Sequence, residues 1–364
     1  MNDVTCRCFA FVVVLIPTLI WADSPQDARD PYKRGMSAFE KDDIDRAIAE
    51  FTEAIRLNPK NSEAYIMRGM AYGSKQDLDR AIADFGKAIQ LAPKEPAGYA
   101  NRGYAYLAKQ DYDRAIADFG EAIHLGRKDS LTYSFRANAY AAKQDYRRAI
   151  ADVTEAIALQ PKEVPLYVNR SAYHTALKEF DSALADCDEA LRLSTKDANV
   201  YYNRGTVYAE RKDHARALAD FDQTIRLAPR HPLAYYDRGN AYLLARKDYE
   251  LAIADYKEAI RVNAMFTYPY FALAHVLATC PKAELRDGKK AVEYATKGCE
   301  VARWQNPGGW RALAVAYAET GNFKEAIKWQ KKALESAQRF PKEQQEEMRI
   351  ELNLFEKGKP YRQK

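Results

Sequence analysis

The chain has 364 residues, of which 47% are hydrophobic and 29% are charged. This composition is that of a folded protein and excludes an intrinsically disordered chain. The formal net charge is +5, and basic and acidic residues alternate without a long basic run, so the charge pattern gives no indication of nucleic acid as a partner.

The first element is an apolar segment at the amino end of the sequence. Residues 8–22 (CFAFVVVLIPTLIWA) are an almost unbroken hydrophobic stretch that follows Arg7. A membrane-spanning helix needs about 20 residues, so this shorter stretch predicts a signal peptide over residues 1–22. The protein is therefore expected to be exported, to the periplasm or the extracellular space. The alternative is a chain that residues 8–22 anchor in the membrane. Residues 23–27 are predicted to be a short linker.

A repeat with a period of 34 residues follows the linker. An arginine marks each of its first seven copies: Arg34, Arg68, Arg102, Arg136, Arg170, Arg204 and Arg238. Fixed positions around each arginine carry aromatic, small and proline residues. In the second copy these are Tyr65, Gly69, Tyr72, Ala81, Phe85, Ala88 and Pro93. In this period and spacing the chain resembles the tetratricopeptide repeat family, as a bacterial exported array of many repeats.

This resemblance implies an all-α fold, a right-handed superhelical solenoid of about nine helix-turn-helix units closed by a C-terminal capping helix. The units are predicted at 28–61, 62–95, 96–129, 130–163, 164–197, 198–231, 232–266, 267–306 and 307–340. A capping helix is predicted at 341–356 and a flexible tail at 357–364. The eighth unit has an extended turn at 281–288, whose role stays open. Residues 277–334 are similar to a C-terminal segment of many bacterial arrays.

Each arginine of the repeat has an acidic residue at a fixed distance after it. The acids lie sixteen residues later, or seventeen in the seventh unit, at Glu50, Asp84, Asp118, Asp152, Asp186, Asp220 and Asp255. The last two units lose both partners together, with Leu273 and Leu313 in place of arginine. We predict a structural ion-pair ladder, which fixes the register of the helices more than it adds stability. The alternative is an arginine stripe that holds anionic ligands.

In the family that the chain resembles, the first helix of each unit faces a concave groove. The matching positions hold aromatic and amide side chains that are expected to bind peptide: Asn101, Tyr104, Asn138, Asn169, Tyr202, Asn203, Tyr236, Asn240, Tyr268 and Phe271. Tyrosine offers apolar area and a hydrogen-bonding hydroxyl. An asparagine amide both donates to and accepts from a peptide backbone. Met67 and Phe135 interrupt the asparagine series, and ordinary helix-surface asparagines are the alternative interpretation.

No pattern in the chain indicates catalysis. Nucleotide-binding loops and zinc motifs are absent, and the five histidines occupy different repeat positions. Outside the signal segment the cysteines are Cys187, Cys280 and Cys299, an odd number for which no disulfide is expected. The chain is therefore predicted not to be an enzyme and to carry no cofactor and no metal.

The sequence favours a non-catalytic scaffold that binds peptide segments or partner proteins in its concave groove. The alternatives are a self-associating or membrane-anchored protein that organises the cell envelope, and an accessory array that delivers substrates to a separate enzyme. Proteins or peptides are the expected partners, and neither nucleic acid nor a small-molecule substrate is expected. A membrane contact is expected only if the amino-terminal segment is not cleaved.

Overall fold

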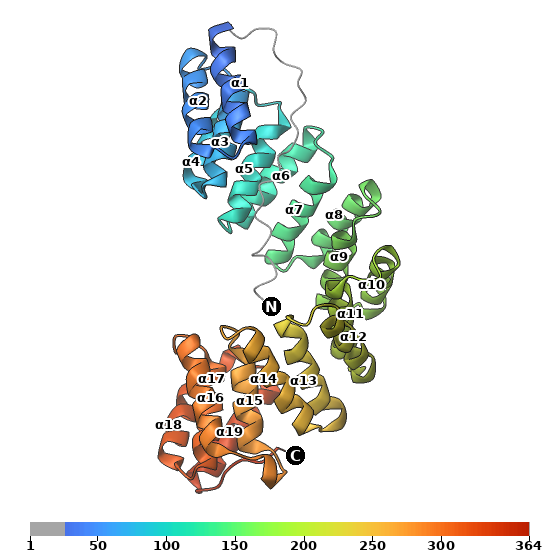
Figure 1. Ribbon diagram of the computed structural model, residues 1–364, viewed down its shortest axis with the longest axis vertical. Coiled ribbons are helices and arrows are strands. Elements are labelled where there is room, and N and C mark those ends of the chain that lie inside the picture. Colours follow the sequence, from blue (N-terminus) through green and yellow to red (C-terminus); the bar gives the residue numbers. More distant parts are fainter. Residues whose placement is uncertain (1–25, 364) are drawn as a thin grey trace. The chain divides into compact units, whose positions relative to one another are not determined.

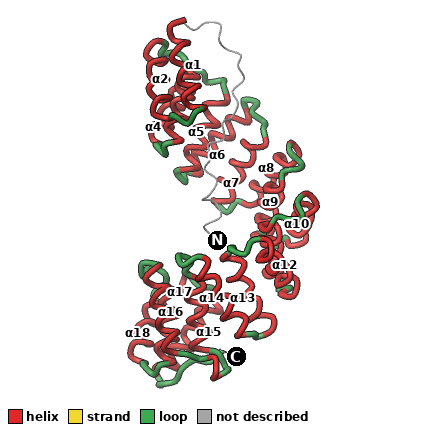
Figure 2. Tube along the Cα trace, viewed as in Figure 1, coloured by secondary structure: helices red, strands yellow, loops and turns green. Residues whose placement is uncertain are grey.

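The computed structural model describes residues 26–363. They divide into two compact parts, an N-terminal part that ends at Glu179 and a C-terminal part that begins at Phe180. Every regular element of the described residues is a helix (Figures 1 and 2), which confirms the predicted all-α fold. The predicted signal segment, residues 1–22, lies outside the described residues. Within residues 26–363, no helix has the length and apolar character that a membrane span requires.

The N-terminal part is a stack of helices in which each helix packs against the next one along the chain (Figure 1). Its helices are α1 (Gln26–Glu40), α2 (Ile44–Leu57), α3 (Ser62–Ser74), α4 (Leu78–Leu91), α5 (Pro96–Ala108), α6 (Tyr112–His124), α7 (Ser130–Ala142), α8 (Tyr146–Leu159) and α9 (Val164–Ala176). Because α1 begins at Gln26, the first helix includes the last two residues of the predicted linker.

The C-terminal part is also a stack in which helices pack against their neighbours along the chain. Its elements are α10 (Phe180–Leu193), α11 (Ala198–Glu210), α12 (His214–Leu227), α13 (Pro232–Arg246), α14 (Tyr249–Val262), α15 (Tyr268–Thr279), the short 3₁₀ helix η1 (Ala283–Leu285), α16 (Gly288–Val301), α17 (Pro307–Glu319), α18 (Phe323–Leu334), η2 (Ala337–Arg339) and α19 (Lys342–Glu356). The 3₁₀ helix η1 lies within the extended turn of the eighth unit.

In each of the first seven units, the turn between the two helices contains a residue with a left-handed backbone conformation. In the hairpin of α5 and α6, Gln110 adopts a left-handed backbone conformation with φ of 62°. The next residue, Asp111, is the N-cap of α6, and its carboxylate accepts a hydrogen bond from the backbone N–H of Arg114. An aspartate cap satisfies a backbone donor that the helix leaves free. The sequence Lys-Gln-Asp therefore ends one helix and starts the next.

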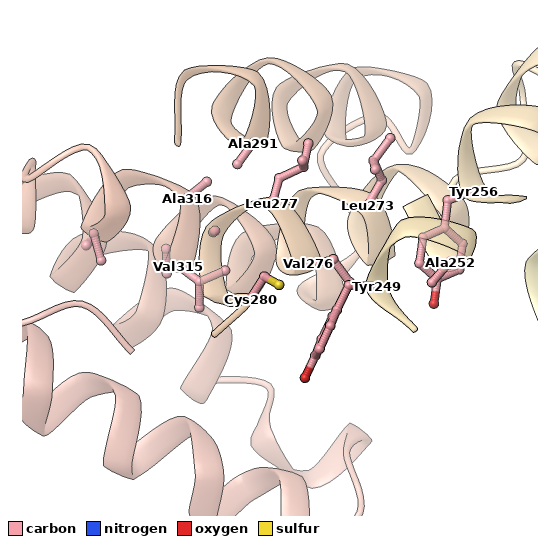
Figure 3. Close-up of a cluster of buried hydrophobic side chains, with 14 of the residues drawn as sticks. Tyr249, Ala252, Tyr256, Leu273, Val276, Leu277, Cys280, Ala291, Val315 and Ala316 are labelled. Carbon is pink, nitrogen blue, oxygen red and sulfur yellow. The ribbon is translucent and has the colours of Figure 1, made fainter. Parts of the chain in front are cut away.

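In five repeats the core contains a glycine that faces an aromatic ring: Gly35, Gly69, Gly103, Gly205 and Gly239. A Cβ atom added at Gly69 on α3 would lie 2.7 Å from the ring of Phe85 on α4, so only glycine permits this approach of the two helices. In the seventh repeat, Tyr256 has the place of Phe85, and buried aliphatic side chains such as Leu273 and Leu277 fill the space toward α16 (Figure 3). Cys187, Cys280 and Cys299 are buried.

The carboxyl end of the described chain differs from the sequence prediction. Residues 357–364 were predicted to be a flexible tail, but residues 361–363 fold back onto α15, α17 and α19. The hydroxyl of Tyr361 donates to Glu347 at 2.7 Å, and the backbone N–H of Gln363 donates to the carbonyl of Thr279 at 2.9 Å. These contacts form because Gly358, with φ of 65°, reverses the chain after α19.

Candidate functional site

Six of the seven predicted arginine–acid pairs are brought together by the structure. Arg102 on α5 donates two hydrogen bonds to Asp118 on α6, from Nε at 2.8 Å and from Nη2 at 2.9 Å. The other pairs also join the two helices of one hairpin: Arg34–Glu50, Arg68–Asp84, Arg136–Asp152, Arg204–Asp220 and Arg238–Asp255. Two parallel hydrogen bonds between a guanidinium and a carboxylate fix both distance and orientation.

Two tyrosines flank each of five ladder arginines. The guanidinium of Arg68 lies 5.7 Å from the ring centre of Tyr65 and 5.9 Å from that of Tyr72. Its hydrogen bonds to Asp84 raise the pKa of the guanidinium above its ordinary value, so the arginine stays charged at every physiological pH. The guanidinium of Arg68 is thus hydrogen-bonded to Asp84 and lies beside two aromatic rings. This geometry favours a structural role for the arginine over the binding of anionic ligands.

The seventh predicted pair stays a prediction, because Arg170 belongs to the N-terminal part and Asp186 to the C-terminal part. In the C-terminal part the ladder gains a second set of acids. Arg204 also donates to Asp188 at 2.9 Å, and Arg238 donates to Asp222 at 2.6 Å. These acids lie on the preceding repeat, so they connect neighbouring hairpins.

The predicted groove residues of the N-terminal part make contacts inside the chain. The amide of Asn101 donates to the carbonyl of Ala97 one turn earlier on α5. Tyr104 packs edge to face on Phe135, with ring centres 5.0 Å apart. The amide oxygen of Asn138 on α7 accepts a hydrogen bond from the hydroxyl of Tyr173 on α9 at 2.9 Å, and Asn169 is partly exposed on α9. This bond takes one of the two acceptor positions of the Asn138 amide oxygen.

In the C-terminal part, four aromatic side chains from α11, α13, the loop before α15 and the start of α15 form one connected surface. We call it the aromatic face: Tyr202, Tyr236, Phe266 and Tyr268. The ring centres of Tyr236 and Phe266 lie 5.4 Å apart, and those of Phe266 and Tyr268 lie 5.9 Å apart. Tyr202 joins them because its hydroxyl donates to Asp237, the neighbour of Tyr236, at 2.7 Å. Three of the predicted groove residues are thus brought together.

Asp237 is the acidic group of the aromatic face. Burial raises the pKa of its carboxyl group to about 6, although the hydrogen bond from Tyr202 opposes this shift. Two predicted groove asparagines lie on the same helices. Asn240 accepts a hydrogen bond from the hydroxyl of Tyr256 at 2.8 Å, and Asn203 donates to the carbonyl of Asn199 on its own helix. Both amides therefore have partners inside the chain.

The prediction for Phe271 was wrong, because this side chain belongs to the core. Phe271 is only 8% exposed, and its ring packs between Gly298 on α16 and Gly309 on α17. A Cβ atom added at Gly298 would lie 2.5 Å from the ring, and one at Gly309 would lie 2.8 Å from it. The two glycines leave a space that the phenylalanine fills, which draws it away from the surface.

A buried polar network at the carboxyl end was not foreseen from the sequence. Arg311 on α17 donates to Glu351 on α19 at 2.7 Å and to Glu347 at 2.6 Å. Gln330 on α18 donates to the same Glu351 at 2.7 Å. Arg311 is the only arginine at the fifth position of any repeat unit, and this was the one available signal. The network attaches the capping helix to the last repeat.

His275 on α15 lies near Arg311 and Glu347 of this network, and the protonation of its side chain leads to a testable prediction. Burial and the positive charge of Arg311 lower the pKa of His275 to about 4. Between pH 7 and pH 5 the unfolded chain therefore binds a proton that the folded chain does not bind. The free energy of unfolding should fall by about 2 kcal/mol over this range because of His275.

Urea unfolding of the wild type and of His275→Gln at both pH values checks this prediction. Asp237 acts in the opposite direction, because its raised pKa stabilises the folded state as the pH falls through about 6. Its contribution is the same in both proteins and cancels in the comparison. Equal loss of stability in the wild type and in His275→Gln would contradict the role of His275.

Comparison with protein families identifies the repeat. A family model described as "Tetratricopeptide repeat" matches more than half of the chain, at residues 32–96, 66–130, 136–198 and 202–265. A second tetratricopeptide repeat model matches residues 311–339. No curated protein matches the chain. The family assignment therefore rests on the repeat itself over most of its copies.

Solved structures share the fold at low sequence identity. A tetratricopeptide repeat protein from Parabacteroides merdae is 19% identical, with a TM-score of 0.55 over 68% of this chain and 98% of that chain. The C-terminal part of a repeat protein from Cytophaga hutchinsonii is also 19% identical, with a TM-score of 0.52 over 67% of this chain and 98% of that chain. The Cut9–Hcn1 hetero-tetramer of the APC/C gives 15% identity and a TM-score of 0.52, and the match covers 75% of this chain and 52% of that chain. The chain belongs to the tetratricopeptide repeat family, whose arrays of helical hairpins are protein-interaction scaffolds.

Proposed function

We propose that this protein is a scaffold that binds an extended peptide segment of a partner protein on the aromatic face. The observation that supports the proposal is that the aromatic face is exposed to solvent at the end formed by residues 265–268. Tyr268 is 54% exposed, and Met265, next to Phe266 in the chain, is 72% exposed. Aromatic side chains that a folded chain holds in place and leaves accessible are typical of the residues that dominate protein interfaces.

The fixed geometry of the aromatic face supports this proposal. Tyr236 is held on one side by Tyr256, with ring centres 5.9 Å apart, and on the other side by Phe266 and Tyr268. Side chains that packing already holds in one conformation lose little entropy when a ligand binds. The hydroxyl of the exposed Tyr268 adds a group that can donate a hydrogen bond to a peptide backbone or accept one from it.

We also propose that the protein is exported. The scaffold would then act outside the cytoplasm, and its partners would be proteins of the envelope or the medium. The self-associating envelope protein and the substrate-delivering array remain as the second and third readings of the same fold. A scaffold for other proteins differs from a self-associating one in what it captures from the cell.

Replacement of Tyr268 by alanine tests the proposal. The bait is the chain from Asp23 onward, used in a pull-down from the envelope fraction of the source cells with mass spectrometry. Tyr268→Ala should weaken the capture of a stoichiometric partner about tenfold or more, because it removes an exposed aromatic contact. The fold should tolerate the change, since more than half of the side chain is already exposed.

The matched control is Leu159→Ala, which removes an exposed apolar side chain, 49% accessible, at the end of α8 in the N-terminal part. It should leave capture unchanged. If Tyr268→Ala and the control capture the same partners equally well, the aromatic face is not the binding surface. Recovery of this chain alone would instead support the self-associating alternative.

A further inference from the structure

Residues 361–363 lie across the carboxyl-terminal ends of two inner helices. The backbone N–H of Gln363 donates to the carbonyl of Thr279, the last residue of α15, at 2.9 Å. Nη1 of Arg362 donates to the carbonyl of Ala278 at 3.4 Å and lies 2.6 Å from Oε2 of Glu319, the last residue of α17. The backbone of Gln363 and the side chain of Arg362 therefore contact two successive repeats.

The chemistry of this surface suits an arginine. Pro281 follows α15 closely, so the last carbonyls of that helix have no partner in a further turn. The carboxyl end of a helix carries partial negative charge. The side chain of Glu319 adds a carboxylate that is only 13% exposed, and Arg286 holds it in place from Nε at 3.0 Å. A guanidinium that enters here finds carbonyl and carboxylate acceptors already fixed.

The residue before the arginine has its own contact. The hydroxyl of Tyr361 donates to Oε1 of Glu347 on α19 at 2.7 Å, and the ring packs against the apolar cluster shown in Figure 3. The segment belongs to no helix. It contacts the protein as an extended peptide ligand does, with one backbone hydrogen bond and two side chains that have separate acceptors.

We propose that this surface is a second peptide-binding site, specific for an extended segment in which arginine follows an aromatic residue, and that residues 361–363 occupy it as a displaceable internal ligand. We call the surface the tail site: Ala278, Thr279, Glu319 and Glu347. The proposal does not rest on the aromatic face, because it involves the carboxyl ends of α15 and α17 and the helix α19.

A covalently attached ligand has a high effective concentration, of the order of millimolar for a short tether. The internal segment therefore blocks the tail site against a free peptide of the same sequence. A partner segment with the same tyrosine–arginine chemistry gains access only when the internal segment is displaced or removed. The array would in this way expose a peptide site at its last repeats only under conditions that release its own chain.

A peptide-binding experiment tests the tail site. The probe is a fluorescein-labelled synthetic peptide of residues 359–363, Lys-Pro-Tyr-Arg-Gln, and fluorescence anisotropy reports its binding to a chain shortened to end at Gly358. The shortened chain should bind the probe at least about tenfold more tightly than the full chain does. A probe with alanine in place of arginine should bind the shortened chain at least about tenfold more weakly, and so should the original probe when the chain carries Glu319→Gln.

Circular dichroism shows whether the shortened chain keeps its helices. A helical shortened chain that does not bind the probe, or a full chain that binds it equally well, would overturn the proposal. If the shortened chain does not fold, the full chain with Arg362→Ala replaces it, because that change loosens the segment without removing it. This variant should gain binding of the probe over the unmodified full chain, and no gain would also overturn the proposal. Loss of the aromatic face through Tyr268→Ala should leave all these results unchanged.

Discussion

Replacement of Glu351 by alanine should destabilise the protein by about 3–5 kcal/mol. Glu351 has no exposed surface, and its carboxylate accepts hydrogen bonds from Arg311 and Gln330. Removal of one member of a buried ion pair costs about this much. In Glu351→Ala, Arg311 would keep only Glu347, whose side chain is 34% exposed, and Gln330 would lose its carboxylate acceptor. The capping helix α19 would lose its main polar attachment to α17 and α18. The free energy of unfolding, measured in urea and followed by circular dichroism, gives the result.

Glu356→Ala is the matched control on the same helix. Its carboxylate lies 3.4 Å from Lys331, but both side chains are about half exposed, and such surface pairs contribute about 1 kcal/mol or less. The expected difference between the two variants is therefore several kcal/mol. Similar losses for Glu351→Ala and Glu356→Ala would contradict the assignment of Glu351 as the centre of a buried network.

Replacement of Arg102 by leucine should cost about 3 kcal/mol. The change leaves the carboxylate of Asp118, which is only 6% exposed, without its guanidinium partner. The double variant Arg102→Leu/Asp118→Leu should be more stable than the single one, because two apolar side chains can pack together where an unpaired charge could not. A comparison of urea unfolding curves for the wild type and the two variants measures both effects.

The control for this pair is Arg114→Leu. Arg114 bonds to Asp111 in the turn, and its side chain is 64% exposed, so the expected loss is about 1 kcal/mol or less. A double variant at 102 and 118 that loses as much stability as the single one, or more, would show that the pair is not the reason for the effect. The ladder would then be a consequence of the fold and not a device that fixes its register.

The repeat made the regular features predictable. Each pair of the ladder, such as Arg102 and Asp118, occurs in several copies at one spacing, and this internal repetition served as evidence of contact. Where a feature occurs once, as Glu351 and Tyr361 do, the sequence offers no second copy for comparison, and the structure was needed to find its partners.

The predicted groove shows a different limit. The position of a residue within the repeat predicts the direction in which its side chain leaves the helix, but it does not predict which neighbouring side chains surround it. Phe271 has the same position as Tyr236, yet Gly298 and Gly309 leave room above Phe271 in the core. Tyr236 meets other aromatic rings and stays near the surface of the aromatic face. The neighbouring side chains of later helices, not the repeat position alone, decided between the two outcomes.

The ion-pair ladder also bears on how such an array changes its length over evolution. In each described pair, both partners lie within one hairpin, sixteen or seventeen residues apart. A duplication or deletion of one whole repeat by unequal recombination therefore adds or removes a complete pair. No step of this kind leaves a buried charge without a partner, which would cost several kcal/mol. Lengthening and shortening of the gene can thus proceed one repeat at a time through stable intermediates.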